Sequence, residues 1–159
     1  MAAWNKLYHR KLFLENRYPK GKVYEDISLT PILVHEADII IYSSTVLYNR
    51  EYRNGSIITV LSEQNAQDYF EALRFATQNL RKWGYVQESE SYLNRRLLEF
   101  VSKGWHSPEH NEWCVRYFRN LNHCPKHFSW KWKGMYHLLL ISPGLCRMVY
   151  KSYMTIYLL

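Results

Sequence analysis

Apolar residues recur at helical spacing through most of the chain after residue 62, and this periodicity is the strongest constraint on the fold. Within 65–84, one helical stripe carries Tyr69, Leu73, Ala76 and Leu80. Gly84 follows this stripe as a stop signal, and Gly104 ends a second segment with the same pattern. Pro108 begins a third. The sequence therefore predicts a mainly helical region over residues 61–159.

The first 60 residues show a different pattern. Asp26 or Ser28 is suited to cap a short helix that holds Pro31 in its first turn. Residues 38–44 and 45–57 are rich in β-branched and aromatic residues, which predicts two strands that end near the turn signal Asn54-Gly55. We therefore expect an α/β piece over 1–60.

The tail of the chain is apolar and basic. The segment 123–134 is predicted to be irregular, and the sequence breaks again at Pro143-Gly144. Lysines and arginines alternate there with tryptophan and tyrosine, a pattern typical of an anionic membrane surface. A helix packed against the rest of the protein explains the same pattern equally well.

The formal net charge of +7 favours anionic partners such as nucleotide diphosphates, lipid phosphates or bilayers. No basic run or recognisable module of nucleic-acid type is present, so we expect no nucleic-acid partner. The odd count of 3 cysteines and the polar, basic stretch from Asn5 to Lys11 predict a reduced, cytoplasmic protein without a signal peptide. No apolar run reaches the length that spans a bilayer.

The acidic pair Glu25-Asp26 lies between a turn and a helix start. Two adjacent carboxylates at such a junction can provide a general base and a supporting group. Ordinary capping and helix-dipole chemistry explains the pair as well.

Arg50 and Arg53, followed by Gly55 and Ser56, can hold phosphate oxygens through charged side chains and backbone N–H groups. A solvated hairpin with surface arginines is the alternative.

A group of histidines and cysteines offers a zinc hypothesis, although its spacing fits no standard finger. Its members are His106, His110, Cys114, His123, Cys124 and His127. Packed or exposed side chains are the favoured interpretation.

Taken in order, the N-terminal motifs resemble the second half of the catalytic domain in bacterial family 2 glycosyltransferases, which build surface polysaccharides. The matching elements are Asn5-Lys6-Leu7-Tyr8, Tyr18-Pro19-Lys20-Gly21, Tyr24-Glu25-Asp26, Leu47-Tyr48-Asn49-Arg50 and Arg53-Asn54-Gly55-Ser56-Ile57. Order and spacing both agree with the family pattern over roughly the first 60 residues.

The resemblance implies a nucleotide-diphospho-sugar transferase (GT-A-like) sheet region over 1–60, followed by a helical annex over 61–159. It implies an inverting transfer from a nucleotide-sugar to a polysaccharide or lipid-linked glycan acceptor, with Asp26 as the base and Glu25 beside the acceptor. Arg50, Arg53 and Ser56 would lie near the diphosphate. Trp4 and Lys6 would lie by the acceptor or the sheet edge.

The chain departs from the family in two respects. Glu51 replaces the glutamine that commonly follows the arginine, which puts an acidic group beside the expected phosphate site. The Asp-x-Asp or Asp-Asp motif, which chelates Mg²⁺ or Mn²⁺ in the family, is absent from this sequence. We therefore expect a fragment that binds no metal alone and needs an N-terminal half for activity, and whose uncovered sheet edge favours self-association. The alternative is a non-catalytic helical module that binds a partner protein or the inner face of the membrane.

Overall fold

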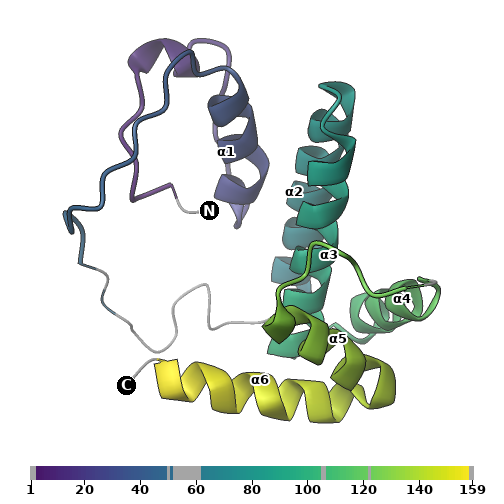
Figure 1. Cartoon of the computed structure of the whole chain (residues 1–159). Helices are drawn as coiled ribbons and strands as arrows, with labels where there is room; N and C mark the ends of the chain where they lie inside the picture. The colour runs from purple at the N-terminus through teal and green to yellow at the C-terminus, as the bar shows by residue number, and fades with distance from the viewer. Residues whose placement is uncertain (1–2, 50, 52–61, 105–106, 122, 158–159) are drawn as a thin grey trace.

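The structure is a computed structural model that describes residues 3–49, 51, 62–104, 107–121 and 123–157, with side chains up to Tyr153. Over these residues the regular elements are one 3-10 helix, η1, and the α-helices α1 to α6 (Figure 1). Their bounds are η1 Arg10–Phe13, α1 Glu25–His35, α2 Glu63–Lys82, α3 Val86–Lys103, α4 Pro108–Arg119, α5 Trp130–Ile141 and α6 Pro143–Tyr157.

The predicted α/β fold class is wrong, because the described part of the chain contains helices and no strand. Residues 38–49, predicted to form strands, run instead as a long open loop that leads away from α1 (Figure 1). Ile39 is 79% exposed and Ile41 is 86% exposed. A β-rich composition favours extended backbone, but a strand also needs a second segment to satisfy its N–H and C=O groups. The described residues of the range 1–60 therefore do not contain the expected GT-A-like sheet region.

The helices α2 and α3 are confirmed where the periodicity predicts them, and they pack against each other. The Ser62 hydroxyl accepts the N–H of Asn65 over 3.2 Å and so caps the start of α2. Both predicted stop signals are confirmed by positive φ angles, 87° at Gly84 and 72° at Gly104. Tyr69 and other members of the predicted stripe face inward, although Leu80 is only half-buried.

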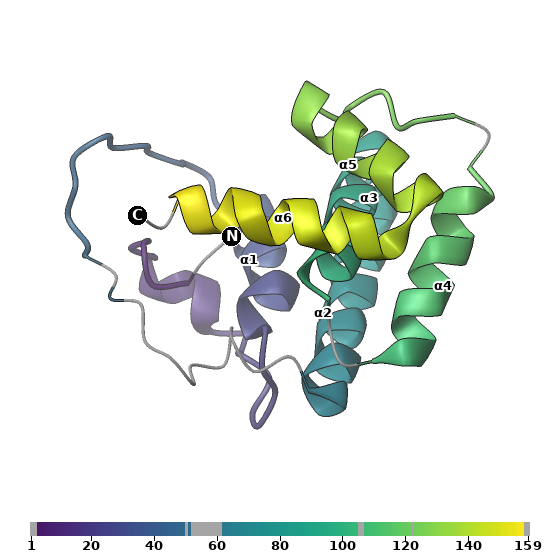
Figure 2. The ribbon, with the colours of Figure 1, turned by 90° about the horizontal axis from the view of Figure 1, so that it is seen from below.

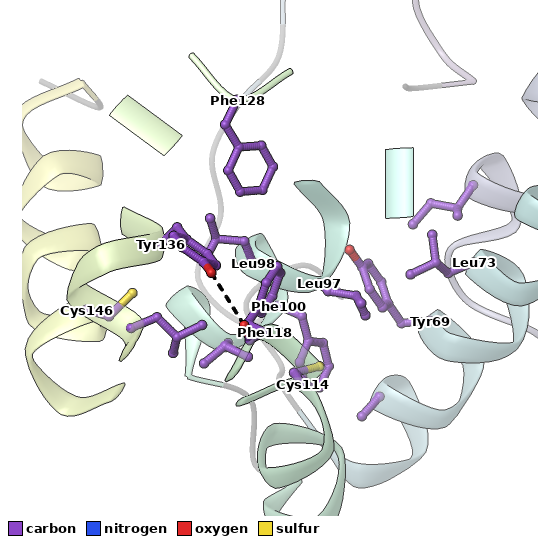
Figure 3. Close-up of a cluster of buried hydrophobic side chains, with 14 of the residues drawn as sticks. Tyr69, Leu73, Leu97, Leu98, Phe100, Cys114, Phe118, Phe128, Tyr136 and Cys146 are labelled. Atoms are coloured by element: carbon purple, nitrogen blue, oxygen red, sulfur yellow. Dashed lines mark hydrogen bonds between the residues drawn. The ribbon is translucent and has the colours of Figure 1, made fainter. Parts of the chain in front are cut away.

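The main core lies where α2, α3, α4, α5 and α6 meet (Figure 3). Leu97 and Phe100 of α3 are fully buried in it, as are Phe118 of α4 and Leu139 of α5. The Tyr136 hydroxyl donates to the Phe118 carbonyl over 3.5 Å, so a buried polar group keeps a partner (Figure 3). Burial of this much apolar surface is the dominant stabilising contribution to the fold.

The short helix α1 packs along α2 and is buried continuously from Ile27 to Leu33. Leu29 and Leu33 form a second cluster with Phe13 and Trp83, and the His35 ring stacks on Trp83 at a centroid distance of 3.9 Å. The expected place of Pro31 in the first turn is wrong, since α1 already starts at Glu25. Burial on several sides offsets the cost of an interior proline.

The helices α5 and α6 form a hairpin across one end of the molecule, so that both lie toward the viewer in Figure 2. The break at Pro143 is confirmed, whereas the predicted irregular segment already becomes helical at Trp130. Among the described residues, no helix combines the length and hydropathy needed to cross a bilayer. The division into 1–60 and 61–159 stays a prediction.

Candidate functional site

A cleft with a volume of about 360 Å³ lies between α2 and the N-terminal part of the chain. Its walls come from the segment before α1, from the first turns of α1 and from α2. The charged residues in these walls are Glu15, Arg17, Lys22, Glu25, Asp68, Glu71 and Arg74. Because both charge signs occur, the cleft offers hydrogen-bond donors and acceptors to a polar ligand.

Lys22 ties the segment before α1 to α2. Its Nζ atom lies 3.0 Å from Asp68 Oδ1 and 3.0 Å from Glu71 Oε2. The backbone N–H of Val23 donates to the other Asp68 oxygen over 3.2 Å, and Gln64 Nε2 donates to Oδ1 over 3.3 Å. These bonds hold the turn before α1 against α2 and so fix one wall of the cleft relative to the other.

The Asp68 carboxylate is charged although its side chain is only 5% exposed. Burial by itself raises the pKa of Asp68, but the hydrogen bonds from Lys22, Val23 and Gln64 outweigh burial and hold this pKa below its ordinary value. Hydrogen bonds to Glu71 and Asp68 raise the pKa of Lys22. Both partners of the ion pair are therefore charged at neutral pH.

The acidic pair Glu25-Asp26 forms the first turn of α1. The predicted cap is wrong, because Tyr24 occupies the N-cap position with a left-handed backbone at φ 62° and makes no side-chain capping bond. Ser28 Oγ instead donates to the Glu25 carbonyl over 2.9 Å. Carboxylates in a first helical turn are stabilised by the helix dipole, so this position accounts for the pair without assigning it a catalytic role.

The two carboxylates of the predicted catalytic pair have different surroundings. Glu25 lines the cleft, whereas Asp26 is not among the described residues that form its walls. Burial raises the pKa of Tyr24 to about 12, and the charge of Asp26 adds to this shift. Burial also raises the pKa of Tyr18 to about 12, with contributions from Tyr8, Glu25 and Asp26. The pair therefore lies near phenols that stay protonated at neutral pH and can donate hydrogen bonds.

The remaining predicted site residues lie outside the cleft walls or outside the described residues. The Trp4 ring stacks on Tyr48 with centroids 4.5 Å apart, and Lys6 Nζ lies 2.6 Å from Asn5 Oδ1. This stacking places the N-terminal segment beside the chain that leads toward residue 50. Three predicted phosphate-binding residues fall in segments that the structure does not describe, namely Arg50, Arg53 and Ser56. The roles of all five residues stay predictions.

The zinc hypothesis finds no support in the described ranges, where no group of three or more His, Cys, Asp or Glu side chains could hold a metal ion. His110 Nδ1 pairs with Ser107 Oγ at 2.6 Å, and Cys114 is fully buried in the core. His106 lies outside the described residues.

Sequence reasoning missed the wall of the cleft that α2 provides. Asp68, Glu71, Phe75 and Gln78 follow one another at three- and four-residue intervals, so they share the helical face next to the buried stripe. This mainly polar stripe is visible in the sequence, but the pattern alone predicts an ordinary helical face exposed to solvent. Nothing in the sequence indicates that α1 and the preceding turn lie against it.

Comparison with known proteins gives one informative relationship. The chain is 30% identical over 99 residues to the protein "Glycosyltransferase GlyA" of Streptococcus pneumoniae serotype 4 (strain ATCC BAA-334 / TIGR4). The match covers 62% of this chain and 14% of that relative, so the chain spans about one seventh of the relative's length. None of the known family models matches the chain, and no solved structure matches it. Over most of its length, the chain is therefore related to a glycosyltransferase.

Proposed function

We propose that this chain is the acceptor-side part of an inverting family 2 glycosyltransferase that acts on a surface-polysaccharide or lipid-linked glycan acceptor. The observation that carries the proposal is the position of Glu25, a residue of the family-like acidic pair, in the wall of a polar cleft. The 30% identity to a glycosyltransferase supports the same class of reaction.

The chemistry of the cleft suits a sugar. Sugars present many hydroxyl groups, and carboxylates with guanidinium groups bind hydroxyls through charge-assisted hydrogen bonds. Glu25 and Glu71 provide acceptors, and Arg17 and Arg74 provide donors. Phe75, which is 48% exposed, adds an aromatic face on which the apolar side of a sugar ring can stack.

We assign two roles to the acidic pair. Asp26 takes the proton from the attacking acceptor hydroxyl, and Glu25 holds the acceptor in the cleft. Both residues belong to the rigid first turn of α1, so their separation is fixed by the helix rather than by a mobile loop.

The nucleotide base of the donor and the Mg²⁺ or Mn²⁺ ion are assigned to a part of the enzyme other than this chain. The described residues present no group of ligands that fits such a metal ion, and the sequence has no Asp-x-Asp or Asp-Asp motif. Arg50, Arg53 and Ser56 keep their proposed place near the diphosphate. The work of this chain is then to bind and orient the acceptor.

Sugar binding by the chain alone tests the cleft. Saturation-transfer NMR with a panel of mono- and disaccharides is expected to detect weak binding to the 159-residue chain. Glu25→Gln and Phe75→Ala should each weaken that binding about tenfold or more, because each removes a contact inside the cleft. Glu88→Gln, an exposed carboxylate at the start of α3, is the matched control. Binding of no sugar, or equal binding by all variants, would remove the cleft from the proposal.

A further inference from the structure

The net positive charge of the chain is confined to its C-terminal part. All 14 Asp and Glu residues lie at or before Glu112, together with 14 of the 21 Lys and Arg residues, so the first 112 residues carry no net charge. The 7 remaining basic residues all follow Glu112, and they account for the whole formal charge of +7. This segment contains the end of α4 and all of α5 and α6.

The hairpin of α5 and α6 carries much of this charge on one end of the molecule. Leu139 of α5 and Cys146 of α6 are fully buried against the core. The opposite sides of both helices point away from α1 and α2, so that α6 forms the lower edge in Figure 1 and the layer nearest the viewer in Figure 2. The hairpin therefore presents an outer face to its surroundings.

The outer side of α5 combines a lysine and a histidine with large apolar residues. Trp130, Lys133, His137 and Ile141 recur at three- and four-residue intervals and are all exposed. Trp130 is 79% exposed and Ile141 is 75% exposed, although both are large apolar side chains. Neither helix of the hairpin has an acidic residue in its described sequence.

The helix α6 likewise exposes apolar side chains and a lysine. Met148 is 59% exposed and Val149 is 37% exposed, and Lys151 is exposed one turn further on. Lys131 Nζ of α5 donates to the Tyr153 hydroxyl of α6 over 2.9 Å. The start of α5 and the end of α6 therefore lie side by side.

We propose that the outer face of the α5–α6 hairpin, carried by Trp130, Lys133, Ile141, Met148 and Lys151, docks on the surface of an anionic lipid bilayer. Lysines attract anionic headgroups, and each Lys or Arg near such a surface strengthens binding about fivefold. Tryptophan rings favour the boundary between headgroups and acyl chains, where the aliphatic side chains also lose water. This inference goes beyond the proposed function and does not depend on it.

The combination of groups favours a bilayer over other anionic partners. A nucleic acid complements the lysines but offers no aliphatic layer to exposed residues such as Ile141 and Met148. A bilayer provides negative charge and an apolar layer directly beneath it, so it can contact the cations and the exposed apolar side chains of this face together. An acidic protein surface is an outcome that the experiment separates.

Vesicle co-sedimentation with the 159-residue chain tests the proposal. We expect binding to phosphatidylcholine vesicles that contain phosphatidylserine and little binding to vesicles of pure phosphatidylcholine. Added salt should weaken the binding to the vesicles that contain phosphatidylserine. The variant Lys133→Glu/Lys151→Glu should bind at least about 25-fold more weakly, since two headgroup attractions are lost and reversed. The variant Lys11→Glu/Lys20→Glu makes the same charge change at exposed sites in the N-terminal segment, and it should bind much more tightly than the first variant.

Quenching by lipids with brominated acyl chains tests the depth of contact. Fluorescence of the wild-type chain should be quenched by such vesicles, and Trp130→Phe should lose a clear part of the quenching while the circular dichroism spectrum stays the same. Absence of binding to phosphatidylserine vesicles overturns the proposal. So does equal binding by the two charge variants, or binding to DNA or polyglutamate in the absence of binding to vesicles.

Discussion

Lys22 Nζ and Asp68 Oδ1 lie 3.0 Å apart, although the two residues are 46 positions apart in the sequence and α1 lies between them. The contact joins the turn before α1 to the second turn of α2. It is strengthened by Val23, whose N–H donates to the second Asp68 oxygen. The candidate acceptor cleft depends on this contact, because its two main walls meet there.

Asp68→Asn should destabilise the chain by about 1–3 kcal/mol. The substitution replaces the buried carboxylate with a neutral amide, so Lys22 loses its buried charged partner. Urea denaturation followed by circular dichroism measures the change. Glu71→Gln is the matched control: its carboxylate contacts the same Lys22 but is 57% exposed, so the loss should stay below about 1 kcal/mol. Equal losses for the two variants would contradict the importance assigned to the buried bond.

Acid should destabilise the fold through Asp68 and Glu99. Burial favours the neutral form of each carboxyl group. The bond from Lys22 nevertheless helps to hold the pKa of Asp68 below its ordinary value, and the bonds from Lys103 and Arg96 do the same for the pKa of Glu99. A carboxylate of this kind contributes stability above its unfolded pKa of about 4 and loses it as the pH falls through the folded pKa. The free energy of unfolding should therefore fall from about pH 5 downward, and it should fall less steeply in Asp68→Asn. Parallel pH profiles for both proteins would refute this.

Asp26→Asn in the complete enzyme should lower kcat about 10² to 10⁴-fold, because the amide cannot take the proton of the acceptor hydroxyl. The acceptor KM should change little. Glu25→Gln should instead raise the acceptor KM, since Glu25 is assigned to the cleft. Steady-state kinetics with varied acceptor separates the two effects, and retained kcat in Asp26→Asn would exclude that residue as the base.

Gly104→Ala should cost more stability than Gly84→Ala. Both glycines end helices with positive φ, so an alanine at either costs about 1–2 kcal/mol of backbone strain. At Gly104 the added Cβ would also lie 3.3 Å from Arg147 Cδ, whereas at Gly84 no atom of the described residues beyond its chain neighbours lies within 4 Å. Arg147 Nε donates to the Val101 carbonyl, so its displacement disturbs a contact between α3 and α6. Thermal unfolding compares the two, and equal losses would show that Arg147 moves at no cost.

Cys124 should react with Ellman's reagent well before Cys114 and Cys146, because the latter two are buried and Cys124 is only partly so. Burial raises the pKa of all three thiols, so the fast phase should accelerate as the pH rises. Cys124→Ser should remove the fast phase. A fast phase that persists in this variant would show that one of the core cysteines is accessible.

The helices of the second half could be predicted because their information is local. Gly84 and Gly104 end α2 and α3 as expected, and Pro108 starts α4. The start of α5 at Trp130 could not be predicted, because tryptophans and lysines alternate there without a helical stripe. In such a segment, tertiary packing through Tyr136 and Leu139 decides the structure.

The strands and the cleft could not be predicted correctly, because both depend on which distant segments meet. The residues around Ile40 have strand composition, yet in the described chain no second segment pairs with them. The cleft joins Lys22 and Glu25 to Asp68 and Phe75 on α2, and no local pattern encodes that meeting. The family resemblance identified Glu25 and Asp26 as a pair to test, but it could not indicate that only Glu25 lines the cleft.

The separation of charge along the chain makes the whole molecule an electric dipole. A neutral body of 112 residues is joined to a C-terminal end that carries the entire +7. Near any negatively charged surface, such a molecule experiences a torque as well as an attraction, so it turns its α5–α6 end forward before contact. At physiological ionic strength this orienting field reaches only about 8 Å, which makes the last step of approach the one that selects orientation.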